Sequence, residues 1–248
     1  MSETSEATPL SPASSKPNVI VVKDSAELAE RAAAHVAALA RDAVRERKSF
    51  HVALAGGTTP RAMYEKLSTR DDVAWRSVHI WFGDERSVPT DHDDSNYRMV
   101  KESLLERTPI PSANVHRMEA DEADLEAAAA AYSAALPEHL DLIILGMGED
   151  GHTASLFPGA AAIQEKLKRV VPVVGPKPPQ KRLSVTPLVI AAARHKLVLA
   201  SGATKADMLA RVLVGPPNPL ALPVQLARDG TWIIDEAAAA KLPAEARP

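Results

Sequence analysis

The segment LDLIILGMGEDGHTASLFPG, residues 140–159, joins a continuous apolar run to a turn that is rich in glycine and polar residues. The four apolar residues from Leu142 to Leu145 favour a strand buried on both faces of a parallel sheet. In open α/β sheets small molecules bind beyond the carboxyl ends of the strands, and glycine lets the backbone approach a ligand closely. The histidine of this turn, His152, is therefore a candidate for catalysis.

The same arrangement recurs at three other places in the chain. VALA is followed by GGTTP (52–60), HIWF by GDER (79–86), and LVLA by SGATK (197–205). Segments with helical spacing separate these runs, which predicts a doubly wound, mostly parallel α/β sheet with helices on both faces. Because parallel strands end at the same edge of a sheet, we expect the four polar clusters to meet in one crevice.

The remaining elements follow this alternation of strand and helix. Strands are predicted at 19–22, 50–55, 78–82, 115–118, 141–145, 182–186, 196–200 and 231–235, and helices up to about Arg47, from Pro60 to about Leu67, from about Ser95, over 122–135 and from about Thr204 to Val212. Asp24 and Glu27 form a capping pair for the first helix. A proline-rich connection is expected over 172–179, and its PKPP segment (176–179) is expected to be an active-site loop.

Composition limits the classes of function. Residues 1–17 are rich in Ser, Thr, Pro and Glu, which predicts a disordered tail, and residues 18–248 are expected to form a single α/β domain. The net charge of -3 argues against a nucleic-acid surface, and the lack of cysteine excludes disulfides and thiolate chemistry. The sequence shows no apolar run of membrane-spanning length and no signal-peptide pattern, so the expected location is cytoplasmic.

The GGTTP turn is a candidate anion site. We expect Thr59 to be the N-cap and Pro60 the first residue of the following helix. Unpaired N–H groups and the positive end of the helix dipole suit a phosphate, and Gly56 and Gly57 let it approach, beside Thr58. A turn that binds nothing is the alternative, and the absence of a GK[ST] ending rules out a P-loop.

Three cations stand beside predicted strand ends. Lys205 lies in SGATK, Arg182 precedes the run LSVT, and Arg86 ends GDER. A single such residue is most often a solvated surface charge. Together with the GGTTP turn, the three would form a local positive pocket in a chain of negative net charge, which suits an anionic sugar phosphate.

Two motifs have competing interpretations. In GDER, the carboxylates of Asp84 and Glu85 either pair with Arg86 or reach the substrate. The following PTDHDDSNY (89–97) contains acids and a histidine, but it lacks a known metal-ligand spacing, so no metal site is predicted.

The segment GMGEDG (146–151) formally matches GxGxxG. The dinucleotide fingerprint needs a helix that opens at the third glycine and an acid at the end of the next strand, whereas the next strand-like run here, VVPVV, ends in GPKPP. We expect these glycines to shape a backbone nest around His152 instead.

Four motifs in the same order carry a family resemblance. AGGTTP, GDERSVP followed by SNY, DGHTASLFPG, and the segment from RLSVT to SGATK resemble the 6-phosphogluconolactonases of the pentose phosphate pathway over about residues 19–235. The resemblance implies hydrolysis of 6-phospho-D-glucono-1,5-lactone to 6-phosphogluconate, without cofactor or metal. It also implies the fold shared with glucosamine-6-phosphate deaminases.

The resemblance implies a role for each matching residue. His152 corresponds to the catalytic histidine that activates the attacking water, Asp150 would orient it, and Arg86 matches a residue that lines the substrate pocket. From the residues themselves we predict that backbone N–H groups of 146–151 or Arg86 stabilise the oxyanion. The predicted catalytic residues are thus His152, Arg86 and Asp150, and the predicted substrate-binding residues are Gly56, Gly57, Thr58, Asp84, Glu85, Arg182 and Lys205. The expected partner is a small sugar-phosphate lactone, with no nucleic acid, no membrane, and a monomer or weak homodimer.

Two alternatives share this general fold. In deaminases the matching turn has a sequence similar to DGHIAFNEPG, in which a glutamate works with the histidine. This chain has Phe157 at the position of that glutamate. Their acid turn resembles MDEY, whereas this chain has GDER, so both departures favour the lactonase. Sugar-phosphate-sensing domains of bacterial regulators carry an added DNA-binding region, which residues 1–17 are too short to form.

Overall fold

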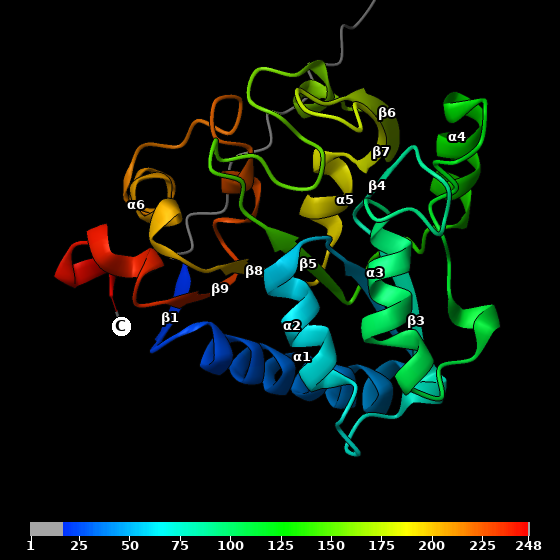
Figure 1. Ribbon diagram of the computed structural model, residues 1–248, viewed down its shortest axis with the longest axis horizontal. Coiled ribbons are helices and arrows are strands. Elements are labelled where there is room, and N and C mark those ends of the chain that lie inside the picture. The colour runs from blue at the N-terminus through cyan, green and yellow to red at the C-terminus, as the bar shows by residue number, and fades with distance from the viewer. Residues whose placement is uncertain (1–16, 248) are drawn as a thin grey trace, which may run out of the picture.

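Six parallel strands form the main sheet. The computed structural model describes residues 17–247, so the predicted tail lies outside the described residues except for Pro17. The strands are β1 (Asn18–Val22), β2 (Phe50–Leu54), β3 (Val78–Phe82), β5 (Leu142–Gly146), β8 (His195–Ala200) and β9 (Thr231–Asp235). Their order is β1-β9-β8-β5-β2-β3, and every pair is parallel (Figure 1). The predicted fold class is confirmed.

The order of the strands reverses between β2 and β5. From β2 the chain moves outward to β3, then returns to β5 and continues in the opposite direction through β8 and β9. Such a switch point is where open α/β sheets bind ligands. The run from Leu142 to Leu145 is buried, as its continuous apolar pattern predicts for a strand covered on both faces.

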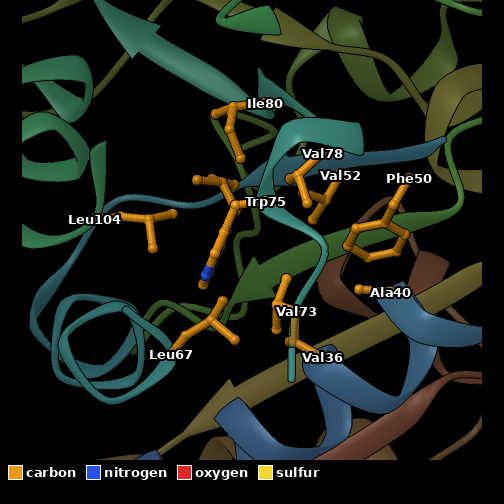
Figure 2. A pocket seen from close by; sticks show the side chains of 11 residues that line it. Val36, Ala40, Phe50, Val52, Leu67, Val73, Trp75, Val78, Ile80 and Leu104 are labelled. Atoms are coloured by element: carbon orange, nitrogen blue, oxygen red, sulfur yellow. The ribbon is translucent and has the colours of Figure 1, made fainter. Parts of the chain in front are cut away.

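Helices cover both faces of this sheet. They are α1 (Ser25–Arg47), α2 (Thr58–Leu67), α3 (Asn96–Ser103), α4 (Leu125–Ala135), α5 (Pro187–Ala192) and α6 (Ala206–Val214), with 3₁₀ turns at Trp75–Ser77, Leu105–Arg107, Ser112–Asn114, Ala161–Gln164, Ala203–Lys205, Pro223–Ala227, Ala238–Lys241 and Ala244–Ala246. Val36 of α1 packs beside Val52 and Ile80 in the apolar pocket of Figure 2. On the opposite face, the ring of Trp81 meets Tyr132 of α4 edge-on at 5.8 Å.

The pocket in Figure 2 is part of the core. Hydrophobic side chains alone line it, and those from β2 and β3 include Phe50 and Val78 at the amino ends of the two strands. It runs beside β2 as far as Leu54 and offers no polar group for chemistry.

Local signals set the start of α1. Asp24 accepts hydrogen bonds from the N–H groups of Ala26 and Glu27, both at 3.0 Å, and Glu27 accepts one from Lys23 N at 2.8 Å. The predicted capping pair is confirmed. Helix α2 differs, because it begins at Thr58 with Gly57 as its N-cap, not Thr59; Gly57 has φ 106°, a conformation that glycine adopts without strain.

A second, antiparallel sheet was not predicted. It contains β4 (Asp84–Arg86), β7 (Lys181–Val185) and β6 (Val170–Val174) in the order β4-β7-β6. Residues 172–174 of the predicted proline-rich connection therefore belong to a strand, and Gly175 N donates to Gln180 O at 2.7 Å to close the β6–β7 hairpin. Figure 1 shows this sheet above the main sheet, with α1 along the opposite side.

The predicted strand 115–118 is wrong. Only Val115 pairs with Ile80, in a single parallel bridge, and His116 N donates to Ile80 O at 2.9 Å. The 3₁₀ turn Ser112–Asn114 directly precedes Val115, so the chain reaches the edge of β3 only at Val115 and pairs with it through that residue alone.

Candidate active site

The four predicted clusters lie at one edge of the main sheet. They follow β2, β3, β5 and β8, which are consecutive in the order β8-β5-β2-β3 and all parallel. The expected emergence of the four loops at one edge is therefore confirmed, and the single crevice stays a prediction. Three sets of contacts then define how close these loops come to one another.

His152 is bound to a carboxylate. Its Nδ1 lies 2.5 Å from Asp150 Oδ1, and its backbone N–H donates to the same oxygen at 3.1 Å. The side chains are 31% and 46% exposed, so solvent and ligands reach both. Burial raises the pKa of Asp150, but the hydrogen bonds from His152 outweigh it and hold that pKa below its usual value. An Nδ1–H that donates to Asp150 leaves Nε2 as the free basic nitrogen.

Glycines shape the turn around this histidine. A Cβ at Gly148 would lie 2.0 Å from His152 Nδ1, so the imidazole packs directly on the glycine backbone. Gly148 N donates to His152 O at 2.9 Å and Gly151 N to Gly148 O at 3.1 Å. Gly151 has φ 83°. Because these two N–H groups bond within the turn, they are occupied as donors.

Phe157 links the histidine to the small sheet. The centroid of its ring is 4.9 Å from the centroid of the His152 ring. The Cζ atom of Arg182 lies 5.4 Å from the centroid of the same Phe157 ring. Arg182 stands opposite Arg86 in the register of β7 and β4. The contacts thus place the imidazole and two guanidinium groups in one neighbourhood.

The two arginines lack acidic partners. Arg182 is buried and donates to the carbonyl oxygens of Pro179 and Lys177, and Arg86 Nη1 donates to Asp94 O at 2.6 Å. Within residues 17–247 neither forms an ion pair, and the buried Nε of Arg86 has no hydrogen-bond partner. Burial and then the charge of Arg86 lower the pKa of Arg182, yet a guanidinium stays charged at neutral pH.

The start of α2 is open. Gly57 and Thr58 are exposed, and no side chain caps this helix. The hydroxyl of Tyr64 accepts from Ala55 N and donates to Ala55 O, both at 2.9 Å, so it fixes the end of β2; its burial raises the pKa of the phenol. Gly56 is required for packing, because a Cβ there would lie 2.0 Å from Asn96 Oδ1.

Lys205 comes from the loop after β8. It ends the 3₁₀ turn Ala203–Lys205, and α6 follows immediately. Met208 of α6 has its sulfur 3.2 Å from the position of a Cβ on Gly151, so this segment lies beside the His152 turn. Among the described residues Lys205 forms no ion pair.

Glu85 is occupied by α3. Its carboxylate accepts from the N–H groups of Arg86, Asn96 and Tyr97 at 2.7–2.8 Å and from Ser95 Oγ at 3.3 Å. Burial raises its pKa, although the backbone donors act in the opposite direction. In the described part of the chain it makes no ion pair with the Arg86 guanidinium, so the predicted alternative of mutual pairing within GDER is wrong.

Asp84 is also held by protein groups. Its Oδ2 accepts from Ser155 Oγ at 2.6 Å, and its Oδ1 accepts from Asn96 Nδ2 at 3.1 Å. Tyr132 makes a further anchor that sequence reasoning missed, because its hydroxyl accepts from Phe82 N at 2.7 Å and donates to Phe82 O at 3.2 Å. Ser155 and Asn96 stand in the quoted motifs DGHTASLFPG and SNY, and that is the signal by which they could have been found.

No group of three or more His, Asp or Glu side chains within 17–247 is arranged to hold a metal ion. In the same range no helix has both the length and the apolar character needed to cross a bilayer.

Comparisons with known proteins agree with the geometry. A family model described as glucosamine-6-phosphate isomerases/6-phosphogluconolactonase matches residues 23–234. Relatives named 6-phosphogluconolactonase include one from Synechocystis sp., 36% identical with 91% of this chain and 98% of the relative covered, and one from Mycobacterium leprae, 35% identical with 91% and 98% covered. The solved 6-phosphogluconolactonase of Leishmania guyanensis superposes with a TM-score of 0.82 at 27% identity, covering 92% of this chain and 99% of that one. A monomeric glucosamine-6-phosphate deaminase at 22% identity shares the fold, with a TM-score of 0.80 over 90% of this chain and 99% of its own. The chain therefore belongs to the glucosamine-6-phosphate isomerase/6-phosphogluconolactonase family.

Proposed function

We propose that this protein hydrolyses 6-phospho-D-glucono-1,5-lactone to 6-phospho-D-gluconate in the oxidative pentose phosphate pathway. The observation that carries the proposal is the His152–Asp150 pair, which contacts apolar Phe157 beside Arg182 and Arg86, two cations that form no ion pair within residues 17–247. A base beside an anion-binding surface is what hydrolysis of a phosphorylated lactone requires. The named relatives support the same substrate.

His152 acts as the general base. Asp150 holds Nδ1–H, so Nε2 takes a proton from a water molecule as that water attacks the lactone carbonyl at C1. Negative charge then develops on the carbonyl oxygen. As the carbonyl re-forms, the bond between C1 and the ring oxygen breaks, and the proton held on Nε2 passes to that ring oxygen. Arg86 is the better placed stabiliser, because its buried Nε lacks a partner among the described residues while two N–H groups of the 146–151 turn are already bonded.

The phosphate binds at the start of α2 together with Lys205. The open N–H groups after Gly57 and the helix dipole attract an anion, and Thr58 adds a hydroxyl. Lys205 supplies a point charge from the neighbouring loop, and Arg182 adds positive potential from the small sheet. Anchoring the substrate at a point remote from C1 positions the carbonyl for attack.

The prediction that Asp84 and Glu85 contact the substrate stays a prediction, and their contacts favour a different role. Both carboxylates are buried and accept hydrogen bonds from protein donors. We propose that they hold β4 and α3 in place behind the site. A cytoplasmic location, a monomeric or weakly dimeric state and the absence of nucleic-acid partners likewise stay predictions.

Deaminase activity is the second candidate, and one observation disfavours it. Phe157, which is 8% exposed, packs against His152 at the position where deaminases are expected to use a glutamate. An apolar ring cannot transfer a proton during sugar-ring opening. The sensor alternative leaves the pairing of His152 with Asp150 without a purpose.

A two-substrate assay tests the proposal. Freshly generated phosphogluconolactone and, separately, glucosamine 6-phosphate are supplied, and acid release and ammonia release are measured above the enzyme-free background. We expect acid from the first and no ammonia from the second, and the variant His152→Gln should lose about 10²- to 10⁴-fold in kcat. Ammonia release would favour the deaminase, and no turnover of either compound would favour the sensor.

A further inference from the structure

We propose that Ser155 is a positioning residue that fixes the His152 turn relative to strand β4. Its hydroxyl donates to Asp84 Oδ2 at 2.6 Å, and the two residues are 0% and 6% exposed. Ser155 lies three residues after His152, and Asp84 lies two residues before Arg86. The bond therefore joins the segment that carries the base to the segment that carries the guanidinium.

The main sheet itself leaves this geometry open. The His152 turn follows β5, and Arg86 follows β3, but β2 lies between these two strands. No backbone ladder joins β5 to β3 directly; each pairs with β2, so direct contact between their loops comes from groups beyond the strand ends. The side-chain bond between Ser155 and Asp84 is such a contact.

Further bonds attach the same residue to the small sheet. The N–H of Ser155 donates to Ser184 Oγ at 3.2 Å, and Ser184 stands opposite Asp84 in the register of β7 and β4. Ser155 is thus bonded through both its backbone and its side chain. Asn96 occupies the other carboxylate oxygen of Asp84 and packs on Gly56, which extends the connection to the loop after β2.

The backbone beside Ser155 indicates that the turn is held under constraint. Ala154 has φ 47°, a left-handed conformation that residues with a side chain rarely adopt. Such a conformation persists when the surroundings determine it. Ser155 directly follows Ala154, and its two hydrogen bonds hold the backbone of Ala154 in this conformation.

Removal of the hydroxyl has a defined consequence. In Ser155→Ala the Asp84 Oδ2 atom loses its only side-chain donor among residues 17–247 and stays buried, which destabilises this arrangement. The turn and β4 can then shift relative to one another. Because the base and Arg86 act on the same carbonyl in the proposed function, on which this inference rests, kcat should fall while phosphate anchorage and KM change little.

The test compares Ser155→Ala with Ser103→Ala. Ser103 is equally buried, but its hydroxyl donates to Met99 O within α3, away from the site. We expect Ser155→Ala to lower kcat about 10- to 100-fold, the usual effect of a small misplacement, with KM within about twofold of wild type. Ser103→Ala should keep wild-type kinetics. Ser155→Cys, which keeps a weak donor, should fall between alanine and serine and also serves if Ser155→Ala does not fold.

Hydrogen–deuterium exchange provides a readout that does not depend on activity. Amides over 148–156 should exchange faster in Ser155→Ala than in the wild type. In Ser103→Ala their exchange rates should equal those of the wild type. Wild-type kcat in Ser155→Ala, or unchanged exchange over 148–156, would overturn the proposal; so would a loss confined to KM, which indicates substrate contact. If the wild-type enzyme lacked lactonase activity, the proposed function would fail, and the exchange measurement alone would decide the positioning role.

Discussion

Replacement of Gly148 by alanine tests the geometry of the base without touching a chemical group. A Cβ at this position would lie 2.0 Å from His152 Nδ1, 2.3 Å from Cε1 and 2.6 Å from Asp150 Oδ1. Gly148 is not among the glycines with positive φ, so alanine can adopt its backbone conformation. The substitution therefore acts through the collision with the imidazole and the carboxylate.

The size of the effect follows from these distances. Ordinary van der Waals contact of a Cβ begins at 3.4 Å, so the Nδ1 atom must move by about 1.4 Å, the difference between 3.4 Å and 2.0 Å. Asp150 is displaced at the same time, so the 2.5 Å bond that orients the imidazole is lost. A misplacement of about 1 Å costs about 10²-fold in rate, and we expect kcat to fall by at least this factor.

The assay is steady-state hydrolysis of the phosphorylated lactone, with thermal unfolding to show that the variant folds. Gly83→Ala is the matched control, because Gly83 also ends a strand at this edge and has no positive φ. Its added Cβ would lie 3.6 Å from Leu54 O, an ordinary contact, so its kcat should stay near wild type. A kcat for Gly148→Ala within about threefold of wild type would refute the claim that this imidazole must stay where it lies.

Three further outcomes are expected. Asp150→Asn removes the charge that orients His152 and should lower kcat about 10- to 100-fold at similar KM; an unchanged kcat would contradict the orienting role. Lys205→Ala should raise KM for the phosphorylated lactone about tenfold and leave turnover of unphosphorylated gluconolactone unchanged. An unchanged KM for the phosphorylated lactone, with altered turnover of gluconolactone, would show that the phosphate binds elsewhere. Burial lowers the pKa of His79 and, together with the charge of His79, lowers those of His51 and His116, so folding stability should be lost as pH falls below about 6.5, the unfolded value. In urea unfolding, the free energy of unfolding of His79→Gln should fall less between pH 7 and pH 5 than that of the wild type. An equal pH dependence in the two proteins would contradict this prediction.

The main sheet could be predicted because parallel strands leave a strong record in sequence. Residues such as Ile143 and Ile144 are covered on both faces, so the strand is a continuous apolar run, and helices with their own spacing separate one run from the next. The convergence of the four loops then follows from topology alone. This is why the candidate site could be assembled before any contact was known.

The small sheet could not be predicted by the same reasoning. Strand β4 consists of Asp84, Glu85 and Arg86, three charged residues with no apolar pattern, and it is a strand because it pairs with β7 nearly a hundred residues later. Pro172 within β6 also argues against a strand, although edge strands tolerate proline. Long-range pairing of polar segments leaves no local periodicity.

The different roles of the side chains in GDER also depend on long-range contacts of β4. Residue types indicated a polar cluster at the edge of the sheet, but they could not tell which side chains face the crevice. Apart from the N–H of neighbouring Arg86, the partners of Glu85 lie at the start of α3, ten or more residues away, and those of Asp84 include Ser155, 71 residues away. Which carboxylates are occupied by the protein is therefore a property of the tertiary structure.

The pairing of β4 with β7 also has an energetic cost that bears on function. It sets Arg86 directly opposite Arg182, and like charges opposite one another on antiparallel strands destabilise a sheet. Within residues 17–247 no carboxylate lies in ion-pair contact with either guanidinium, and the Nε of Arg86 is buried without a partner. A fold under selection for stability alone would place an acid there, because a paired charge costs less than an isolated one. In the proposed function these two arginines receive the negative charge of the substrate, so the arrangement that weakens the free protein would strengthen its hold on the substrate and on the oxyanion formed at C1.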